Sequence, residues 1–361
     1  MRILFLNHNF YEQGTYWRCI FLARYLVRMG HDIIIVARSK NSKVHRFSKW
    51  GVETIFFPGW KTQWLMRLPL VIGTNFDLIH IFAAANFCNT LPGLFARLFK
   101  GVQILVDWDD WYTRGGFIQG KPWVPIITMM EEKLPTLASA VTVVSEALRR
   151  RALSCGVEDE KIFKIENGSN VDDIRVLSKN ESRRKLSINN SPIMLYLGSY
   201  PPEIEFLLRV IKDVRDMVKE VKLMVVGCQG SCTDLVSFFG RVDHEKVQYY
   251  LAAADVLCMP MNDSLVERAR WPIKLGDYMA SGRPIVGSNV GEVGRILREV
   301  DNGLVSNPNK PSDMASNIVS LLKDETRSAE LGGKIRRLAE RKYAWKLIAD
   351  RLEIVYKEVI A

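Results

Sequence analysis

Short apolar runs and longer amphipathic stretches alternate along this chain, and the whole pattern occurs twice. An apolar run followed by a turn and a helical pattern, repeated several times, is typical of parallel α/β units. The predicted strands of the first set are 2–6, 33–36, 78–81, 104–106 and 141–144, and those of the second set are 193–197, 223–226, 256–258 and 284–286. The sequence therefore predicts two doubly wound domains, over residues 1–175 and 190–343.

The connection between the two sets and the last part of the chain have patterns of their own. Residues 167–170 form a turn cluster, and the polar stretch from Ser178 to Ser191 is typical of a linker. The run from Trp345 to Val359 has the apolar spacing of an amphipathic helix.

The segment 269–286 combines clear helix signals with candidate chemistry. Pro272 suits the first turn of a helix, Ser281-Gly282 ends that helix, and a buried strand follows. Free N–H groups and the positive end of the dipole at the helix start attract an anion, and Lys274 lies beside them. Asp277 lies three residues on, on nearly the same helical face. This arrangement suits the diphosphate and the ribose hydroxyls of a nucleotide.

The order Pro272-x-Lys-x-x-Asp-Tyr-Met-Ala-x-Gly-x-Pro-Ile-Val286 resembles the donor-binding segment of retaining GT-B glycosyltransferases of the family 4-like, group 1 type. The resemblance implies an α/β fold of two facing, doubly wound, Rossmann-like domains with an interdomain cleft. The first domain would lie on the acceptor side and be joined by the C-terminal helix 344–361, and the second would bind the nucleotide sugar. In such relatives the residue at the position of Asp277 binds the ribose. A sugar-contacting Glu commonly lies eight residues earlier, where this chain has Ala269, with Glu267 two residues before it.

A glycine loop follows the first predicted strand, which ends at Asn7. Gly14 and Thr15 precede a helix predicted from Cys19, and glycine allows a ligand to approach the backbone closely. The spacing Gly-x-Gly-x-x-Gly is absent, so a nicotinamide dehydrogenase loses its main support. The resemblance implies that this loop contacts the distal phosphate or the sugar of the donor.

Further donor contacts are expected in the second domain. Gly198 and Ser199 end its first strand, where glycine allows a pyrophosphate to approach. Relatives often have an Arg or Lys shortly after this strand, whereas the loop here is uncharged, so the positive charge is expected from Arg270 and Lys274. Arg241 precedes a helix predicted over 244–253 and is a candidate for stacking on the nucleotide base.

Three carboxylates follow the predicted strand 104–106, in the order Asp107-Trp108-Asp109-Asp110. One interpretation is the Asp-x-Asp motif with which GT-A glycosyltransferases hold a divalent ion. Under the GT-B interpretation, Asp109 and Asp110 are the catalytic candidates, which contact the donor sugar or accept the acceptor proton. A third interpretation is a solvated acidic turn in which Asp110 caps a helix.

Composition narrows the classes of partner. The net charge is +10, yet the basic clusters 149–151, 183–185 and 336–337 lie on predicted helices without interleaved aromatics, which favours solvated helix faces over nucleic-acid binding. The six cysteines are scattered and fit reduced thiols better than disulfides or a zinc site. No apolar run reaches ~18 residues and the chain starts directly with a strand, so we expect a cytoplasmic protein.

The segment 60–68 mixes aromatic, aliphatic and basic residues. It is either an interfacial helix that touches an anionic membrane, which would place the protein peripherally at the inner membrane surface, or a half-buried helix on its own domain.

Together, these features predict a hexosyltransferase type of enzyme that moves a sugar from a nucleotide-diphosphate sugar to a sugar, lipid-linked or polysaccharide acceptor with retention of configuration. The nucleotide sugar is a co-substrate, and no cofactor or metal is expected to be tightly bound, because Lys274, Arg270 and helix-start amides offset the charge of the leaving diphosphate. Two alternatives remain open: a catalytically silent nucleotide-sugar-binding protein, which Ala269 favours, and a GT-B-fold epimerase.

Overall fold

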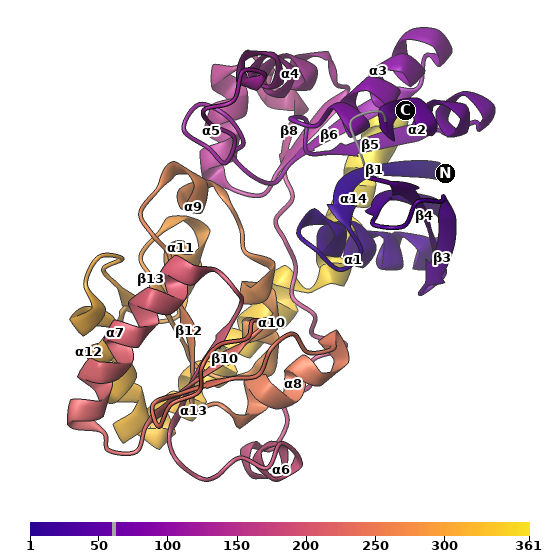
Figure 1. The fold of residues 1–361 in the computed structure, drawn as a ribbon. Coiled ribbons are helices and arrows are strands. Elements are labelled where there is room, and N and C mark those ends of the chain that lie inside the picture. Colours follow the sequence, from indigo (N-terminus) through magenta and orange to yellow (C-terminus); the bar gives the residue numbers. More distant parts are fainter. Residues whose placement is uncertain (60–62) are drawn as a thin grey trace. The chain divides into compact units, whose positions relative to one another are not determined.

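The computed structural model describes residues 1–59 and 63–361. The chain forms two compact units, of which the first comprises 1–167, 269–271 and 345–361 and the second comprises 168–268 and 272–344 (Figure 1). The chain leaves the first unit at Asn167, before the predicted boundary. The polar stretch 178–191 is not a linker, because it lies in the second unit and contains the helix α6 (Lys179–Lys185).

An eight-stranded sheet organises the first unit, with the order β3-β4-β2-β1-β5-β6-β7-β8. All pairs are parallel except β3 with β4. The five predicted strands are present, and β3, β4 and β8 add to them. The strands are β1 (Arg2–Phe10), β2 (Asp32–Ser39), β3 (His45–Lys49), β4 (Val52–Pro58), β5 (Leu78–Phe82), β6 (Gln103–Trp108), β7 (Ala140–Val143) and β8 (Ile162–Lys164).

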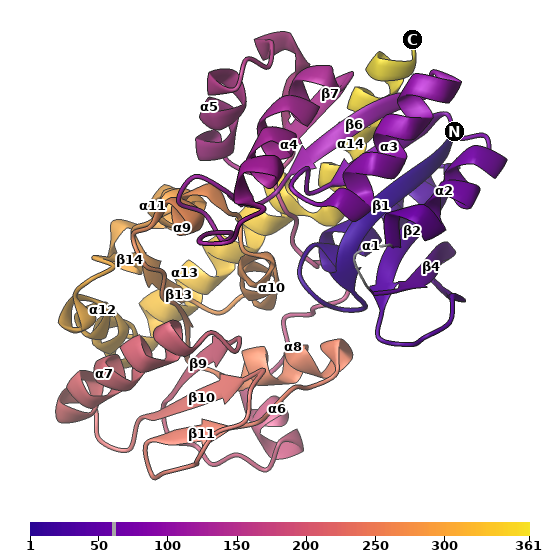
Figure 2. The same ribbon diagram turned by 45° about the horizontal axis from the view of Figure 1, so that its top comes forward.

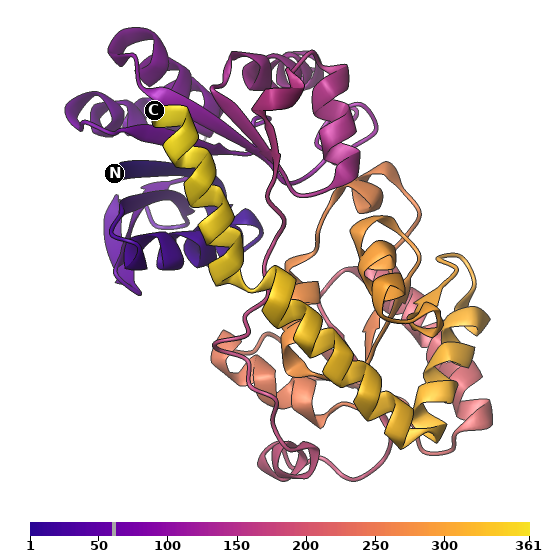
Figure 3. The same cartoon turned by 180° about the vertical axis from the view of Figure 1, so that it is seen from behind.

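Helices cover this sheet, and the last helix of the chain is one of them. They are α1 (Thr15–Arg28), α2 (Gln63–Gly73), α3 (Phe87–Lys100), α4 (Val124–Leu137), α5 (Glu146–Ser154) and α14 (Trp345–Ile360). The apolar face of α14 packs beside α1, where the rings of Phe21 and Trp345 lie 5.3 Å apart (Figure 3). The sequence pattern from Trp345 to Val359 thus forms a helix that completes the core of the first unit.

The predicted interfacial segment 60–68 corresponds in part to α2. Residues 60–62 lie outside the described residues. In α2, Leu65 and Met66 are exposed, whereas Arg67 is fully buried and donates to Asn89 Oδ1 at 2.6 Å and to Asn7 O at 3.1 Å. The helix therefore packs on its own unit with one face and exposes apolar side chains on another. Within the described residues, none of the helices has both the length and the apolarity that a bilayer span requires.

The second unit is built on a six-stranded parallel sheet with the order β11-β10-β9-β12-β13-β14 (Figure 2). Its strands are β9 (Ile193–Leu197), β10 (Lys222–Val226), β11 (Val236–Phe238), β12 (Val256–Met259), β13 (Ile285–Ser288) and β14 (Val305–Ser306). Besides α6, its helices are α7 (Pro201–Met217), α8 (His244–Ala253), α9 (Leu265–Ala269), α10 (Ile273–Ser281), α11 (Gly291–Val300), α12 (Pro311–Lys323) and α13 (Glu325–Leu338). The four predicted strands are all present.

The helix α10 begins after Pro272 and ends at Gly282, whose φ of 70° is left-handed, as the sequence signals predict. It is held at very short range, because a Cβ on Gly276 would lie 2.0 Å from the carbonyl oxygen of Gly168. The Ser169 hydroxyl also donates to Gly276 O at 2.5 Å. On the other side, a Cβ on Gly332 of α13 would lie 2.2 Å from Gly282 O. Three glycine contacts therefore fix the position of α10.

The basic clusters are not simply solvated helix faces. Each contributes one arginine with structural partners: Arg151 is buried against Glu131, Arg183 is buried against Asp255, and Arg336 donates to the carbonyls of Val171 and Ile174. Part of the net positive charge thus serves internal ion pairs and helix anchoring.

We expect Gly332→Ala to destabilise the protein by about 1–3 kcal/mol, because its methyl group overlaps Gly282 O in the packed interface of α13 with α10. Gly333→Ala is the matched control on the same helix, since its Cβ would meet only the far end of the Arg337 side chain at 3.3 Å. That variant should gain up to about 1 kcal/mol from helix propensity. Urea unfolding of both variants measures the difference, and equal effects would contradict the close packing of α10.

Candidate functional site

A buried ion pair lies at the carboxyl end of β6 in the first unit. Arg18 of α1 binds Asp107 with Nη2 2.7 Å from Oδ2 and with Nε 3.1 Å from Oδ1, and both side chains are fully buried. The remaining Arg18 donors reach Ile165 O, Glu166 O and Asn167 Oδ1 at 2.8–3.0 Å. Burial alone would raise the pKa of Asp107, but the charge of Arg18, with the nearby His80 ring, outweighs it and lowers that pKa. Asp107 is therefore ionised and structural.

His80 of β5 extends this network to the C-terminal helix. Its Nε2 lies 3.6 Å from Asp107 Oδ2, and its Nδ1 lies 2.6 Å from the hydroxyl of Tyr356 on α14. Burial lowers the pKa of His80, although Asp107 opposes the shift. The ring is thus a neutral link between the sheet and α14.

Asp109, two residues after Asp107, has an environment that raises the pKa of its carboxyl group rather than lowering it. The Thr15 hydroxyl donates to its Oδ2 at 2.6 Å, and the Tyr112 hydroxyl donates to its Oδ1 at 3.2 Å. Burial, and then the charge of Asp107, raise the pKa of Asp109 to about 6. Asp109 is therefore the carboxyl group here that changes charge near neutral pH.

The predicted glycine loop orients Thr15 toward Asp109. Gly14 caps α1 with a left-handed φ of 49°, and a Cβ there would lie 2.8 Å from Asn9 Nδ2. Asn9 Oδ1 in turn accepts from the backbone of Thr15 at 3.2 Å. Two of the predicted residues, Gly14 and Thr15, thus lie at the same strand ends as the catalytic candidate.

Glu131 of α4 holds the loop after β6, a role that no motif in the sequence indicates. Its carboxylate accepts from Trp108 Nε1 at 3.2 Å and from the backbone amides of Tyr112 and Thr113 at 3.1 and 2.9 Å. Arg151 pairs with the same carboxylate at 3.0 Å. This buried pair fixes the loop that carries Asp109 and the half-buried Asp110.

The structure bears on two of the three interpretations of the acidic run, the solvated turn and the metal ligand. A solvated acidic turn is wrong for Asp107 and Asp109, since both are buried. Both oxygens of Asp107 bind Arg18, and Thr142 also donates to Oδ2 at 2.7 Å. In the part of the chain that the structure describes, no group of three or more His, Cys, Asp or Glu side chains is arranged to hold a metal ion. The chemistry at Asp107 is that of a paired anion, not that of a cation ligand.

Two glycines shape the carboxyl end of β9 in the second unit. Gly198 has a φ of 153°, and a Cβ on it would lie 2.6 Å from the Tyr196 hydroxyl. Gly227, which follows β10, has a φ of 123° and would place a Cβ 2.9 Å from Gly198 O. A Cβ would clash at both positions, so both turns require glycine.

Lys274 lies at this same edge, but it already has a partner. Its Nζ lies 2.6 Å from Glu203 Oε2 and 4.3 Å from the centre of the Tyr196 ring. Glu203, on the first turn of α7, is buried and also accepts from the Tyr196 hydroxyl. The expectation of an uncharged segment after β9 is therefore incomplete, because the helix that follows supplies a buried carboxylate.

Asp277 is buried one turn along α10. Asn170 Nδ2 donates to its Oδ1 at 2.7 Å, and His244 Nε2 lies 3.9 Å from its Oδ2. Burial raises the pKa of Asp277, while His244 and the hydrogen bond from Asn170 offset part of the shift. The next residue, Tyr278, accepts from the amide of Leu197 at 2.7 Å, which ties α10 to the end of β9. Lys274 and Tyr278 thus place α10 at the carboxyl edge of the second sheet, and Asp277 lies on the same helix.

The other predicted donor residues are placed differently. Ser199 and Arg241 are exposed on loops of the second unit. Arg270 is half-buried and groups with the first unit, where its neighbours are anchored: Ser145 donates to Ala269 O and Asn167 donates to Trp271 O. Glu267 is buried at α9. The expected donor residues therefore divide between the two units.

Two family profiles match the chain and together span most of it. The glycosyl transferase 4-like domain matches residues 17–168, and glycosyl transferases group 1 matches 191–324. Among solved structures, sucrose-phosphate synthase from Thermosynechococcus elongatus is 19% identical with a TM-score of 0.77 and covers 99% of this chain and 98% of its own. Anabaena Alr3699/HepE in complex with UDP and glucose is 16% identical with a TM-score of 0.77, covering 99% and 100%. The class is thus the GT-B glycosyltransferases.

Within that class, this chain belongs to the group 1, family 4-like glycosyltransferases. It is 24% identical to the glycosyltransferase MJ1607 of Methanocaldococcus jannaschii, over 95% of this chain and 94% of that protein. It is 26% identical to the phosphatidyl-myo-inositol mannosyltransferase of Mycobacterium leprae over 60% of this chain, and the match spans only 58% of that relative. The family and fold predictions are confirmed.

We expect Lys274→Ala to destabilise the protein by about 3 kcal/mol, because it leaves the buried Glu203 carboxylate without its cation. The double variant Lys274→Ala/Glu203→Gln should regain most of this loss, since no unpaired charge remains. Urea unfolding measures both, with Lys346→Ala as control because its pair with Asp350 is exposed and contributes little. A double variant as unstable as the single one would contradict the pair's role.

A second prediction concerns pH. Because the pKa of Asp109 rises on folding from an ordinary 3.8 to about 6, the folded state retains a proton that the unfolded chain releases. The contribution of Asp109 to stability is therefore present at low pH and is lost as the pH rises through about 6. Asp109→Asn should gain stability relative to the parent by roughly 1 kcal/mol between pH 5 and pH 8. Urea unfolding at both pH values tests this, with the exposed Asp216→Asn as control, and a pH-independent difference would refute it.

Proposed function

We propose that this protein is a retaining glycosyltransferase of the hexosyltransferase type, which moves a sugar from a nucleotide diphosphate to an acceptor hydroxyl. The observation that carries the proposal is the position of α10, which bears Lys274 and Asp277, at the edge of the second sheet where the turn at Gly198 lies. Ligands of open α/β sheets bind at the carboxyl ends of the strands. A cation, a carboxylate and backbone amides are the groups that a diphosphate and a ribose require.

Lys274 and Asp277 already have partners in the structure, so the donor would replace some of these contacts on binding. Lys274 is held beside Glu203 and the Tyr196 ring, so its ammonium is oriented before any diphosphate arrives. Asp277 keeps one oxygen on Asn170, and its other oxygen, 3.9 Å from His244 Nε2, would accept a ribose hydroxyl. Solved structures of the Anabaena neighbour are titled as complexes with UDP, with UDP and glucose, and with UDP-glucose, which supports a nucleotide-sugar donor. The turn glycines, with Gly14, Ser199 and Arg241, would complete the donor contacts.

The proposed transfer reaction needs no nucleophile from the protein. In retaining transfer of this kind, the leaving diphosphate accepts the proton of the incoming hydroxyl on the same face of the sugar, and the bond to the diphosphate oxygen breaks as the new glycosidic bond forms. Lys274, Arg270 and backbone amides would offset the charge on the leaving group, without a tightly bound metal or cofactor. Asp109 and Asp110 would position the sugar or the acceptor and stabilise positive charge at the reacting carbon.

A lipid-linked acceptor is supported by two observations. The Mycobacterium leprae relative is named as an enzyme acting on phosphatidyl-myo-inositol. In the first unit, the neighbouring helices α2 and α3 expose large apolar side chains, namely Leu65, Met66, Ile72, Leu98 and Phe99. With a net charge of +10, this surface suits peripheral contact with an anionic membrane from the cytoplasmic side. Sugar and polysaccharide acceptors are the alternatives that an acceptor screen would separate.

Donor binding and transfer test the proposal together. A thermal-shift panel of UDP-, GDP-, ADP- and TDP-sugars should identify one stabilising donor, and the double variant Lys274→Ala/Glu203→Gln should bind it at least about tenfold more weakly. Asp110→Asn should lower transfer by about 10²-fold with donor affinity nearly unchanged, since its role is in the transition state. The anomeric proton of the product, read by NMR, should keep the configuration of the donor, and activity should survive excess EDTA.

Each alternative gives a different result. A silent binder would hold the donor without consuming it, and an epimerase would change the donor sugar without any acceptor. An inverted product would overturn the retaining assignment and make one of the aspartates a general base. Loss of activity in EDTA with recovery on manganese would overturn the metal-independent mechanism.

A further inference from the structure

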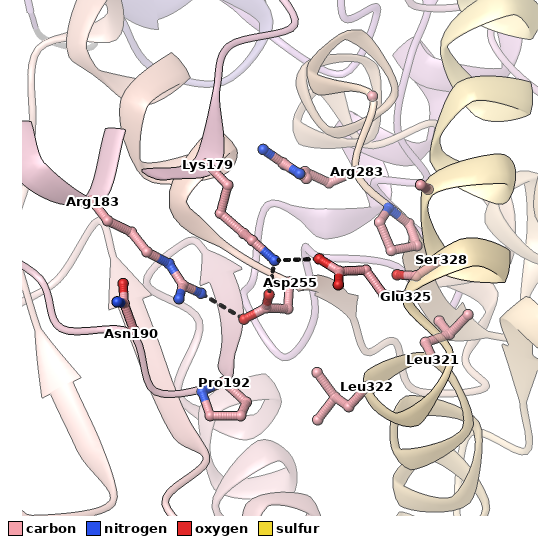
Figure 4. A pocket seen from close by; sticks show the side chains of 13 residues that line it. Lys179, Arg183, Asn190, Pro192, Asp255, Arg283, Leu321, Leu322, Glu325 and Ser328 are labelled. Atoms are coloured by element: carbon pink, nitrogen blue, oxygen red, sulfur yellow. Dashed lines mark hydrogen bonds and ion pairs between the residues drawn. The ribbon is translucent and has the colours of Figure 1, made fainter. Parts of the chain in front are cut away.

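The second unit has a pocket of about 420 Å³ at the opposite edge of its sheet (Figure 4). Three of the residues that line it, Pro192, Asp255 and Pro284, immediately precede β9, β12 and β13. The strands are parallel, so their amino ends lie together here while their carboxyl ends lie at Gly198. A five-residue strand is about 16 Å long, so the pocket is distinct from the proposed donor site. Its size is within the range of ligand pockets.

Cations outnumber anions in this pocket. Lys179 and Arg183 of α6 both bind Asp255, at 2.9 and 2.6 Å, and Asp255 also accepts from the amide of Ile193 at 2.7 Å. Asp255 is thus fully engaged. The other carboxylate, Glu325, lies 3.3 Å from Lys179, but its side chain is 87% exposed. Glu325 can therefore turn to solvent at little cost and release Lys179.

Arg283 is the cation without a carboxylate. Its Nη2 donates to Leu177 O at 3.2 Å, and among the described residues no carboxylate lies within ion-pair distance of it. Its Nε is buried without a hydrogen-bond partner in the same set of residues. Burial, and then the charge of Arg183, lower the pKa of Arg283, with Asp255 opposing the shift. A partly buried guanidinium in this state would gain from an added anion.

The rest of the pocket wall is mixed, with polar Asn190 and Ser328 beside an apolar part. Leu321 and Leu322 come from the end of α12, and Pro192 and Pro284 from the strand starts, while Ser328 of α13 lies at the rim. In Figure 4, Leu322 and Pro192 lie away from the guanidinium of Arg283. An inorganic anion alone would leave this apolar surface uncovered, whereas an anion with a compact organic body would cover it.

We propose that this pocket binds a small organic phosphate, with the phosphate between Arg283 and Lys179 and the organic body on Leu322 and the two prolines. This goes beyond the proposed transfer reaction, because no step of that reaction uses the amino edge of the sheet. On binding, the phosphate takes the place of Glu325 at Lys179, and the displaced Glu325 carboxylate is hydrated by solvent.

Calorimetry with the full chain and phenyl phosphate tests the proposal, at constant ionic strength. Phenol is the control that lacks the phosphate, and inorganic phosphate is the control that lacks the organic group. Phenyl phosphate should bind more tightly than either. Arg283→Gln should weaken its binding at least about tenfold, since a hydrogen bond to a charged group contributes about 1.5–3 kcal/mol. Ser328→Asp, at a half-buried helix position, should weaken it likewise by placing a carboxylate at the rim.

The donor-site variant Lys274→Ala/Glu203→Gln is the control, and it should bind phenyl phosphate as the parent does. If that variant loses binding while Arg283→Gln keeps it, the phosphate occupies the donor site and the proposal is wrong. Equal affinity for inorganic and phenyl phosphate would overturn the role of the apolar wall. If Arg283→Gln does not fold, the Ser328→Asp variant provides the test instead. An unchanged affinity of that variant for phenyl phosphate would refute binding in this pocket.

Discussion

The buried pair of Arg18 and Asp107 is the interaction on which the first unit depends. It joins α1 to the end of β6, and the remaining donors of Arg18 hold the carbonyls of Ile165 and Glu166 and the side chain of Asn167, where the chain leaves that unit. Asn167 continues the link by donating to Trp271 O at 2.7 Å. Segments far apart in sequence therefore meet at one guanidinium. A planar group with five donors suits this role, which lysine could not fill.

The same pair sets the electrostatics of the catalytic candidate. Asp107 and Asp109 are two residues apart and both buried, yet one has a lowered pKa and the other a raised pKa. The difference arises because Asp107 has the cation, whereas Asp109 has only hydroxyl donors and the repulsion of Asp107. Two neighbouring carboxyl groups whose pKa values are shifted apart are typical of sites in which one group stays ionised and the other exchanges a proton.

In the second unit, the corresponding constraint is the ion pair of Lys274 with the buried carboxylate of Glu203. Lys274 is held by Glu203, and the glycine contacts of α10 fix the helix that carries it. A lysine held by a buried carboxylate is already oriented, so less side-chain entropy is lost when an anion replaces part of that contact. Glu203 also opposes the approach of any anion, so in the proposed donor site it would lower donor affinity while Lys274 raises it.

The sequence by itself determined the elements and the family. The nine predicted strands, the helix between Pro272 and Gly282 and the final helix depend on local periodicity and capping, and the motif from Pro272 to Val286 has short-range spacing. The tertiary structure alone decided the partners: Glu203 for Lys274 is 71 residues away, Arg18 for Asp107 is 89 away, and Asp255 for Arg183 is 72 away. It also formed the helix α6 within the polar stretch 178–191, and it added β3, which is mostly exposed, and β8, which is only three residues long. The local sequence pattern indicates which face of a helix or strand is buried. The pairing of buried charges depends instead on how elements distant in sequence pack together, and no short window of sequence contains that information.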